Sequence, residues 1–521
     1  MSVATTTVFL FVLILFPLDS ESLECINSTS YMDRVLVKPR SSECRMKSAL
    51  CVKTMQISQN TDGSPKVLSI HRECFELEPP IGYREGKSCL DSFGTKCLSL
   101  QILVYSPRMI PSHVSFVANI ANLLADRGHK VVVIDNVLRS DIPNRLNVTA
   151  VDKVITVKTS KNVAELLADK SIPSKLWRMK NEPEEQKEVM QNLGELFLEQ
   201  CNYLMTNEKM FDELRKVDLD FGIHEVFDVC GIGIFEKLGL RNSVILSSTG
   251  VRDIVNEALG ISGPLQDSSI LSDYGGSVPI LGTRRNLKFH SAWRNFFEIQ
   301  SKQLEQSFNF DSSFEDLLRY SNLMFLNTHE LTDTQRPWSR RVHEIGGISF
   351  KTPKLLDDEY INLFSNYSTV VLVSFGTTTP SLLMPEDYKN TLISVFLKLP
   401  KVLFIWKYEK EDQFTKEYNG KNVIFKNYVP QVDLLESKRI SLFITHGGQN
   451  SLLEAFHSNT RTLIIPLFGD QHRNAQISLE NGLSLVLKKE DLTNDEMNRG
   501  QFETSVYESP KCETKFRNTF N

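Results

Sequence analysis

The stretch from Phe443 to Gln471 most constrains the fold, because its pattern is that of a strand, a glycine turn, a helix and a second strand. The apolar run Ser441–Thr445 stops at the triplet His446-Gly447-Gly448. Helical spacing of apolar residues follows, and the second run, Thr462–Pro466, stops just before Asp470 and Gln471. Polar residues therefore cluster at the carboxyl ends of two strands. In an open parallel sheet that edge is where ligands bind, so the pattern predicts a ligand site here.

The glycine turn predicts an anion site. Glycines let the backbone approach a ligand closely, and the following helix directs its free N–H groups and positive dipole end toward that ligand. His446, Asn450 and Ser451 add side-chain donors, and Glu454 lies one turn further along. A carboxylate there can accept hydrogen bonds from the hydroxyls of a ribose. The structural alternative is that Ser451-x-x-Glu454 is only a capping box, which the spacing also fits.

These residues resemble the signature of the UDP-glycosyltransferases, the family of the UDP-glucuronosyltransferases. The motif His446-Gly447-Gly448-x-Asn450-Ser451, then Glu454, then Pro466, then Asp470-Gln471, follows the family spacing over the whole stretch. One departure is Arg461, where the family has proline before the second strand, and we expect only a local effect. The resemblance implies an α/β protein of two facing Rossmann-like domains, the GT-B fold, with the UDP-sugar bound by the C-terminal one.

The chain has 521 residues, 41% of them hydrophobic and 24% charged, with a net charge of −5, which argues against nucleic acid as a partner.

The beginning of the chain has the pattern of a signal peptide. The apolar run Val8–Pro17 is too short for a secure membrane span, and residues 1–22 are the expected leader. Sequons at Asn27, Asn147 and Asn366 agree with entry into the secretory pathway. We therefore expect the chain in the endoplasmic reticulum lumen or secreted.

Residues 23–97 carry six of the nine cysteines, which predicts a small disulfide-rich module. The six are Cys25, Cys44, Cys51, Cys74, Cys89 and Cys97. The sequence does not choose among their pairings. A zinc site is the rival interpretation, but these residues contain no C-x-x-C pair. The module is an insertion relative to the family, whose first strand follows its leader closely.

Residues 98–345 are expected to form the N-terminal, acceptor-binding domain. Its first unit is a strand at Ser99–Ser106, a loop, a helix at Val114–Asp126 and a strand at Lys130–Asp135. His113 stands where the helix begins, and a helix N-terminus keeps an imidazole neutral and able to accept a proton. An isolated loop histidine without a role is the plain alternative. Ser112-His113 matches the family position of the catalytic base, so the resemblance implies that role for His113.

A catalytic histidine is best oriented by a carboxylate. The family pattern places an acid five residues before a Cys-Gly pair, and counting back from Cys230-Gly231 leads to Glu225. The resemblance therefore implies Glu225 as the orienting acid. Asp228 fits better as a helix N-terminal acid that favours the helix dipole.

Residues 346–490 are expected to form the C-terminal, UDP-sugar-binding domain of alternating strands and helices. The strand Thr369–Ser374 ends at a small-residue turn that resembles the family's diphosphate-binding turn. Where the family has Trp-x-Pro-Gln for the uracil and ribose, this chain has Tyr428-Val429-Pro430-Gln431, which keeps an aromatic face. The implied donor-binding residues are Ser374, Gly376, Thr377, Tyr428, Gln431, His446, Gly448, Asn450, Ser451, Glu454, Asp470 and Gln471. No metal is expected, since the reaction needs no acidic cluster, and the UDP-sugar is a co-substrate.

Residues 491–521 depart from the family pattern. Residues 494–521 contain no apolar run of membrane-spanning length, so we expect no transmembrane anchor in this chain and a loss of the helices that cross back onto the N-terminal domain. The expected function is transfer of glucuronate or glucose from a UDP-sugar to a hydroxyl of a small lipophilic acceptor, with inversion. Two alternatives stay open. One is an inactive homologue that binds a UDP-sugar or a partner, and the other is a secreted protein whose main function lies in the cysteine-rich module.

Overall fold

The structure is a computed structural model, and its chain separates into two compact units, residues 9–100 and the remainder. The residues it describes are 49–59, 65–76, 99–140, 148–168, 172–250, 253–259, 268–275, 278–308, 310, 312–334, 339–348, 350 and 352–493. The signal peptide, most of the cysteine-rich module and the tail from residue 494 therefore lie outside the described residues. So do the sequons at Asn27 and Asn147, whereas Asn366 is exposed.

Within residues 9–100 the structure describes an antiparallel pair of strands, β1 (Ala49–Gln59) and β2 (Pro65–Glu76). Cys51 and Cys74 are register partners in this pair. The other four cysteines of the module fall outside the described residues, so its disulfide framework stays a prediction.

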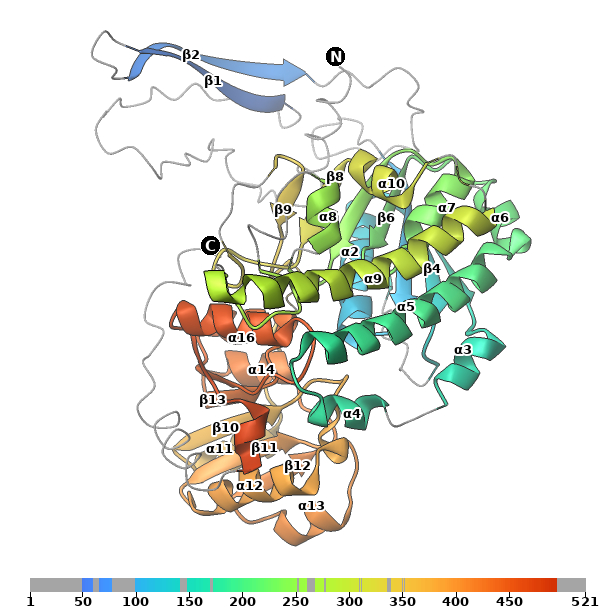
Figure 1. Cartoon of the computed structure of the whole chain (residues 1–521). Helices are drawn as coiled ribbons and strands as arrows, with labels where there is room; N and C mark the ends of the chain where they lie inside the picture. The colour runs from blue at the N-terminus through green and yellow to red at the C-terminus, as the bar shows by residue number, and fades with distance from the viewer. Residues whose placement is uncertain are drawn as a thin grey trace. The chain divides into compact units, whose positions relative to one another are not determined.

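The N-terminal α/β domain is built on a seven-stranded parallel sheet of order β5-β4-β3-β6-β7-β8-β9. Buried apolar runs form the central strands, because helices cover both faces of a parallel sheet, whereas the edge strand at Lys153–Val157 is mostly exposed. The strands are β3 (Gln101–Arg108), β4 (Lys130–Val137), β5 (Lys153–Val157), β6 (Phe221–Glu225), β7 (Ser243–Ser247), β8 (Leu323–Leu326) and β9 (Val342–Glu344). The helices are α2 (Pro111–Asp126), α3 (Lys161–Leu166), α4 (Ile172–Arg178), α5 (Pro183–Met205), α6 (Glu208–Leu214), α7 (Cys230–Leu238), α8 (Asp253–Ala258), η1 (Ile280–Gly282), α9 (Thr283–Phe308) and α10 (Phe314–Tyr320). The long helices α5 and α9 pack along each other (Figure 1).

The C-terminal α/β domain is built on a six-stranded parallel sheet of order β12-β11-β10-β13-β14-β15. Its strands are β10 (Thr369–Ser374), β11 (Val402–Lys407), β12 (Val423–Lys426), β13 (Ile440–Thr445), β14 (Thr462–Ile464) and β15 (Ser484–Val486). Its helices are α11 (Asp358–Ser365), η2 (Ser381–Leu383), α12 (Glu386–Leu397), α13 (Gln413–Tyr418), α14 (Gln431–Glu436), α15 (Gln449–His457), α16 (Gln471–Glu480) and η3 (Lys489–Thr493). In both sheets the strand order reverses beside the first strand, which is the doubly wound arrangement. The predicted fold class of two Rossmann-like domains is confirmed.

Helix α4 belongs to the N-terminal half of the sequence but packs on the C-terminal domain. Trp177 is fully buried and joins the hydrophobic core around β10, β11 and α12. Its ring meets Phe375 edge to face at 5.1 Å between centroids, and its Nε1 donates to Pro380 O at 3.3 Å. Lys489 of η3 also contacts this helix, and its Nζ donates to Leu176 O at 3.1 Å. The two domains are thus joined through a shared hydrophobic core.

Two local expectations are corrected. Helix α2 begins at Pro111 and not at Val114, because proline is well suited to the first helical position, where its missing N–H costs nothing. The capping-box interpretation of Ser451-x-x-Glu454 is wrong: Gly448 is the N-cap of α15, and Ser451 is the third residue inside the helix.

None of the helices in the described part of the chain combines the length and apolar character that a membrane span requires.

Candidate active site

A cavity of about 1300 Å³ lies between the loops at the carboxyl ends of the two sheets. Its walls include His113 from α2 and Phe227 beyond β6, together with Gly376, His446 and Asn450 from the C-terminal domain. These segments follow β3, β6, β10 and β13, which are the strands on either side of the two strand-order reversals. The two reversal points therefore face one shared cavity, the position where doubly wound sheets bind ligands.

His113 lies in the first turn of α2, and its Nδ1 is 3.3 Å from Oε1 of Glu225. His113 is only 7% exposed, and its ring and the Phe227 ring meet edge to face with 5.4 Å between centroids. Glu225 is the last residue of β6, on the strand next to β3. The structure thus brings together two residues that are more than a hundred positions apart in the sequence.

Glu225 is held by donors from two neighbouring loops. Its Oε2 accepts from Phe227 N at 2.8 Å, and its Oε1 accepts from Ser248 N at 3.2 Å and Ser248 Oγ at 3.1 Å. The carboxylate is completely buried. Because several donors fix it in place, it can orient the His113 ring.

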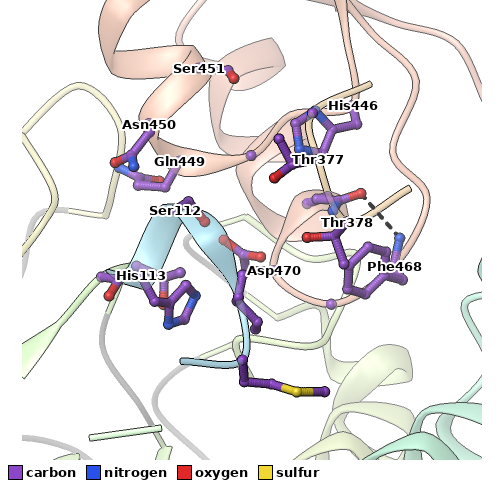
Figure 2. Close-up of a pocket in the computed structure, with 18 of the residues that line it drawn as sticks. Ser112, His113, Thr377, Thr378, His446, Gln449, Asn450, Ser451, Phe468 and Asp470 are labelled. Atoms are coloured by element: carbon purple, nitrogen blue, oxygen red, sulfur yellow. Dashed lines mark hydrogen bonds between the residues drawn. The ribbon is translucent and has the colours of Figure 1, made fainter. Parts of the chain in front are cut away.

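The opposite wall of the cavity is the N-terminus of α15 (Figure 2). Gly447 has φ = +85°, a conformation that turns the chain sharply from β13 into the helix. Gln449, Asn450 and Ser451 occupy the first turn, where backbone N–H groups have no intrahelical acceptor. In Figure 2 this turn lies across from Ser112 and His113. The arrangement suits an anion placed between the helix end and the His113 side.

His446 is enclosed by two glycines. A Cβ atom at Gly376 would lie 2.7 Å from its ring, and one at Gly448 would lie 2.6 Å from its Nε2. Burial, assisted by the nearby Lys407 ammonium, lowers the pKa of His446 from 6.5 to about 4. The imidazole is therefore neutral at physiological pH and offers one N–H donor.

Substituting Gly376 with alanine is expected to weaken the binding of UDP, the ligand that the family resemblance implies, roughly 5- to 30-fold, because the residue has φ = +76° and the new methyl group displaces His446. Isothermal titration with UDP measures the effect. Gly420→Ala is the matched control, since Gly420 has φ = +85° but a methyl group there would meet no atom within 4 Å. Equal UDP affinities for the two variants would contradict the role given to this turn.

Gln431, Ser451 and Glu454 form one hydrogen-bonded group on the same side of the cavity. Gln431 Nε2 donates to Glu454 Oε2 at 2.7 Å and to Ser451 Oγ at 3.2 Å. Tyr428 also lines the cavity and is 68% exposed, so its ring face is open to a planar ligand. All four of these predicted residues line the cavity.

Asp470 and Gln471 lie at the start of α16. Asp470 Oδ2 accepts from Asn474 Nδ2 at 2.9 Å, and Gln471 Oε1 accepts from Leu467 N at 3.0 Å and Phe468 N at 3.2 Å. Both lone pairs of Gln471 Oε1 thus hold its own loop, and the side chain can offer a ligand only its amide N–H groups. Ser374, Thr377 and Gly448 complete the set of predicted residues that line the cavity.

Residues 101–503 match the family model described as "UDP-glucoronosyl and UDP-glucosyl transferase". The chain belongs to this family. It is 72% identical over 407 residues to the putative UDP-glucuronosyltransferase ugt-55 of Caenorhabditis elegans, covering 78% of this chain and 80% of that protein. It is 47% identical to the putative UDP-glucuronosyltransferase ugt-56 of the same organism over 77% of this chain and 78% of that protein. The family assignment makes the chain a glycosyltransferase that uses a UDP-sugar donor.

Solved structures agree on the fold. The Phytolacca americana UGT2 complexed with UDP-2fluoro-glucose and pterostilbene superposes with a TM-score of 0.52 at 14% identity, covering 78% of this chain and 91% of that chain. Glycosyltransferase VinC in complex with DTDP gives a TM-score of 0.52 at 16% identity, covering 78% of this chain and 92% of that chain. At these identities the likeness shows the GT-B arrangement alone.

The candidate site also contains residues that the sequence analysis did not identify. Ser248 follows β7 and donates to Glu225, and Lys407 ends β11 with its Nζ donating to Gly376 O at 2.6 Å. Both are polar residues at the carboxyl end of a strand. In an open parallel sheet, ligands bind at the carboxyl ends of the strands, which is the rule used for the Phe443–Gln471 stretch. The same rule could have identified both residues from the sequence.

A disulfide between Cys201 and Cys230 joins α5 to the start of α7, five residues beyond Glu225. The sequence analysis assigned no partner to either cysteine. Beside the disulfide, Asp228 Oδ1 accepts from Cys230 N at 2.8 Å, and its Oδ2 accepts from Tyr105 OH at 2.5 Å. Asp228 therefore lies at the N-terminus of α7, as predicted, and connects this helix to β3.

The transferase is expected to lose stability as pH rises from about 4 to about 7, because of Asp228. Burial, together with the charge of Glu225, raises the pKa of this carboxyl from 3.8 to about 7, against the hydrogen bonds from Tyr105 and Cys230. In that window the folded protein binds a proton that the unfolded chain releases, so the free energy of unfolding falls with rising pH. Asp228→Asn removes this contribution. Urea midpoints measured near both ends of the window should fall less with pH in the variant, and equal falls would contradict the assignment.

Proposed function

We propose that the enzyme transfers glucuronate or glucose from its UDP-sugar to a hydroxyl of a small lipophilic acceptor, with inversion at the anomeric carbon. The observation that carries the proposal is that His113, which pairs with the buried Glu225, lines the same cavity as the α15 N-terminus. One wall can accept a proton, and the other can hold a diphosphate.

On the acceptor side, His113 is the general base. Its Nδ1–H donates to Glu225, which leaves Nε2 to take the proton of the acceptor hydroxyl as that oxygen attacks the sugar. The buried Glu225 carboxylate then stabilises the imidazolium that forms. The new bond joins the acceptor oxygen to the anomeric carbon, and the bond to the phosphate oxygen breaks from the opposite face. UDP leaves with the electron pair.

On the donor side, the N–H groups at the start of α15 stabilise the charge that grows on the leaving diphosphate. The neutral His446 and the Asn450 and Ser451 side chains add donors, and Gln431 with Glu454 can bind the ribose hydroxyls. The UDP-sugar is a co-substrate, and the proposed reaction uses no metal ion. The described residues contain no cluster of three or more metal-ligating side chains.

The acceptor is proposed to be lipophilic because apolar side chains cover the wall beside His113. They come from the loop after β3, from α5 and from the segment after β6, and include Met109, Ile110, Val189, Leu193, Leu196 and Phe227. Burying apolar surface there favours an acceptor with a hydrophobic body and one hydroxyl.

The sequence pattern of the leader supports a place for the enzyme in the secretory pathway.

The test is to incubate the purified chain with UDP-glucuronate or UDP-glucose and a panel of phenols, and to measure UDP release together with the glycoside. We expect turnover with one donor and a product of inverted configuration. UDP binding without release from either donor would support the non-catalytic alternative. Glu225→Gln is expected to lower kcat while leaving UDP affinity unchanged, since its carboxylate lies in the other domain.

A further inference from the structure

The loop after β8, residues 327–334, contacts the donor-binding helices at three points. Asn327 Nδ2 donates to Asn450 Oδ1 at 2.5 Å, and Gln449 Nε2 donates to Thr332 Oγ1 at 3.0 Å. Arg473 of α16 forms a buried ion pair with Asp333, at 2.8 Å. This loop of the N-terminal domain therefore holds the ends of both helices that line the donor side of the cavity.

Asn327 differs from Thr332 and Asp333 because it also contacts Ser248, the residue that holds Glu225. Its Nδ2 donates at 3.1 Å to the carbonyl oxygen of Ser248, the residue whose N and Oγ both donate to Glu225. Asn327 is completely buried, and its backbone N donates to Ser247 O at 2.9 Å. Its backbone is thus fixed to β7, and its amide bridges the two halves of the site.

The bridge also sets the orientation of Asn450. Because Asn450 Oδ1 accepts from Asn327, the amide nitrogen of Asn450 is the end left to donate to a ligand in the cavity. Asn327 Oδ1 has no hydrogen-bond partner among the described residues, so the side chain is held by its two donor contacts alone. Leaving the buried Asn327 Oδ1 without a hydrogen bond costs free energy, which the two donor contacts of the same amide must offset.

We propose that Asn327 is a positioning residue that couples the occupied donor site to the His113–Glu225 pair. The path runs from Asn450 through Asn327 and Ser248 to Glu225, and each step is a direct hydrogen bond. Donor binding at α15 thereby fixes the distance between the diphosphate and the base. The inference rests on the proposed function, in which His113 is the base.

Asn327→Ala is expected to lower kcat about 10- to 100-fold, the effect of loosening a catalytic alignment by about 1 Å, with little change in the affinity for UDP. Thr332→Val is the matched control. It removes the hydrogen bond between Gln449 Nε2 and the same loop, together with the bonds of Thr332 Oγ1 to the His329 backbone, and among the described residues Thr332 forms no hydrogen bond with Ser248. We expect this variant to melt at a lower temperature and to keep the wild-type kcat.

Hydrogen exchange with and without UDP gives a readout that needs no turnover. In the wild type, UDP is expected to slow exchange at the start of α15 and also at the Phe227 and Ser248 amides, which donate to Glu225. In Asn327→Ala the protection of α15 should remain and that of the two distant amides should disappear. The proposal is overturned if UDP protects the Phe227 and Ser248 amides equally in Asn327→Ala and in the wild type. It is also overturned if Thr332→Val loses this protection to the same extent as Asn327→Ala. Absence of transfer by the wild type overturns the proposed function instead.

Discussion

Replacing His113 with alanine is expected to lower kcat by about 10²- to 10⁴-fold, the usual contribution of a positioned general base. The acceptor hydroxyl must lose its proton as it attacks, and the His113 imidazole lies 3.3 Å from the buried Glu225 carboxylate. Affinity for UDP should stay at the wild-type value, because the diphosphate is proposed to bind the C-terminal domain. Product formation measured at saturating UDP-sugar, with titration of UDP in parallel, separates these two effects.

His129→Ala is the matched control for this experiment. His129 follows the opposite end of the same helix, and it is buried to the same degree as His113. Burial lowers its pKa, and it does not line the cavity. The control variant should lose stability and keep its turnover per folded molecule. Turnover that survives in His113→Ala would refute the proposed mechanism.

The fold could be predicted from the sequence because its elements have strong local signals. The strand Thr369–Ser374 has the predicted bounds in the structure. It combines a continuous apolar run with a clear end at a turn of small residues. The start of α2 was predicted three residues late, because the segment before Val114 has the composition of a loop.

The parts of the candidate site could be predicted from the sequence to different degrees. Much of the donor side lies on the continuous Phe443–Gln471 motif, so the prediction of an anion site followed from the glycine turn and the helix end alone. The pairing of His113 with Glu225 required the family resemblance, since only the strand order places β3 beside β6. Asn327 and the Cys201–Cys230 disulfide were not predicted, because contacts between side chains from distant segments have no local sequence pattern.

The link between the domains was the weakest part of the sequence-based interpretation. The C-terminal crossing helices were expected to be lost, and with them part of the closure that forms the site. That tail lies outside the described residues. Within them, α4 already joins the domains, because Trp177 inserts into the core of the C-terminal domain. The adjoining residues Lys175, Leu176, Arg178 and Met179 line the cavity.

Trp177→Ala is therefore expected to lower the free energy of unfolding by about 3–5 kcal/mol, the usual cost of truncating a buried aromatic side chain. It should also raise the KM for the acceptor, because α4 loses its main anchor and the wall that it forms moves. The pair between Arg178 and Asp387 cannot hold the helix alone, since both side chains are about half exposed and such pairs contribute little. Denaturant unfolding and acceptor saturation curves measure the two effects.

Trp406→Ala distinguishes loss of the anchor from general loss of stability. Trp406 is fully buried in the same core, and its Nε1 donates to Ser381 within the C-terminal domain at 3.1 Å. We expect a similar fall in stability from this variant, while hydrogen exchange in α4 stays slow. In Trp177→Ala the amides of α4 should exchange quickly even where the rest of the domain is folded. If both variants expose α4 to the same extent, the helix is held by the folded domain as a whole and Trp177 is not its anchor.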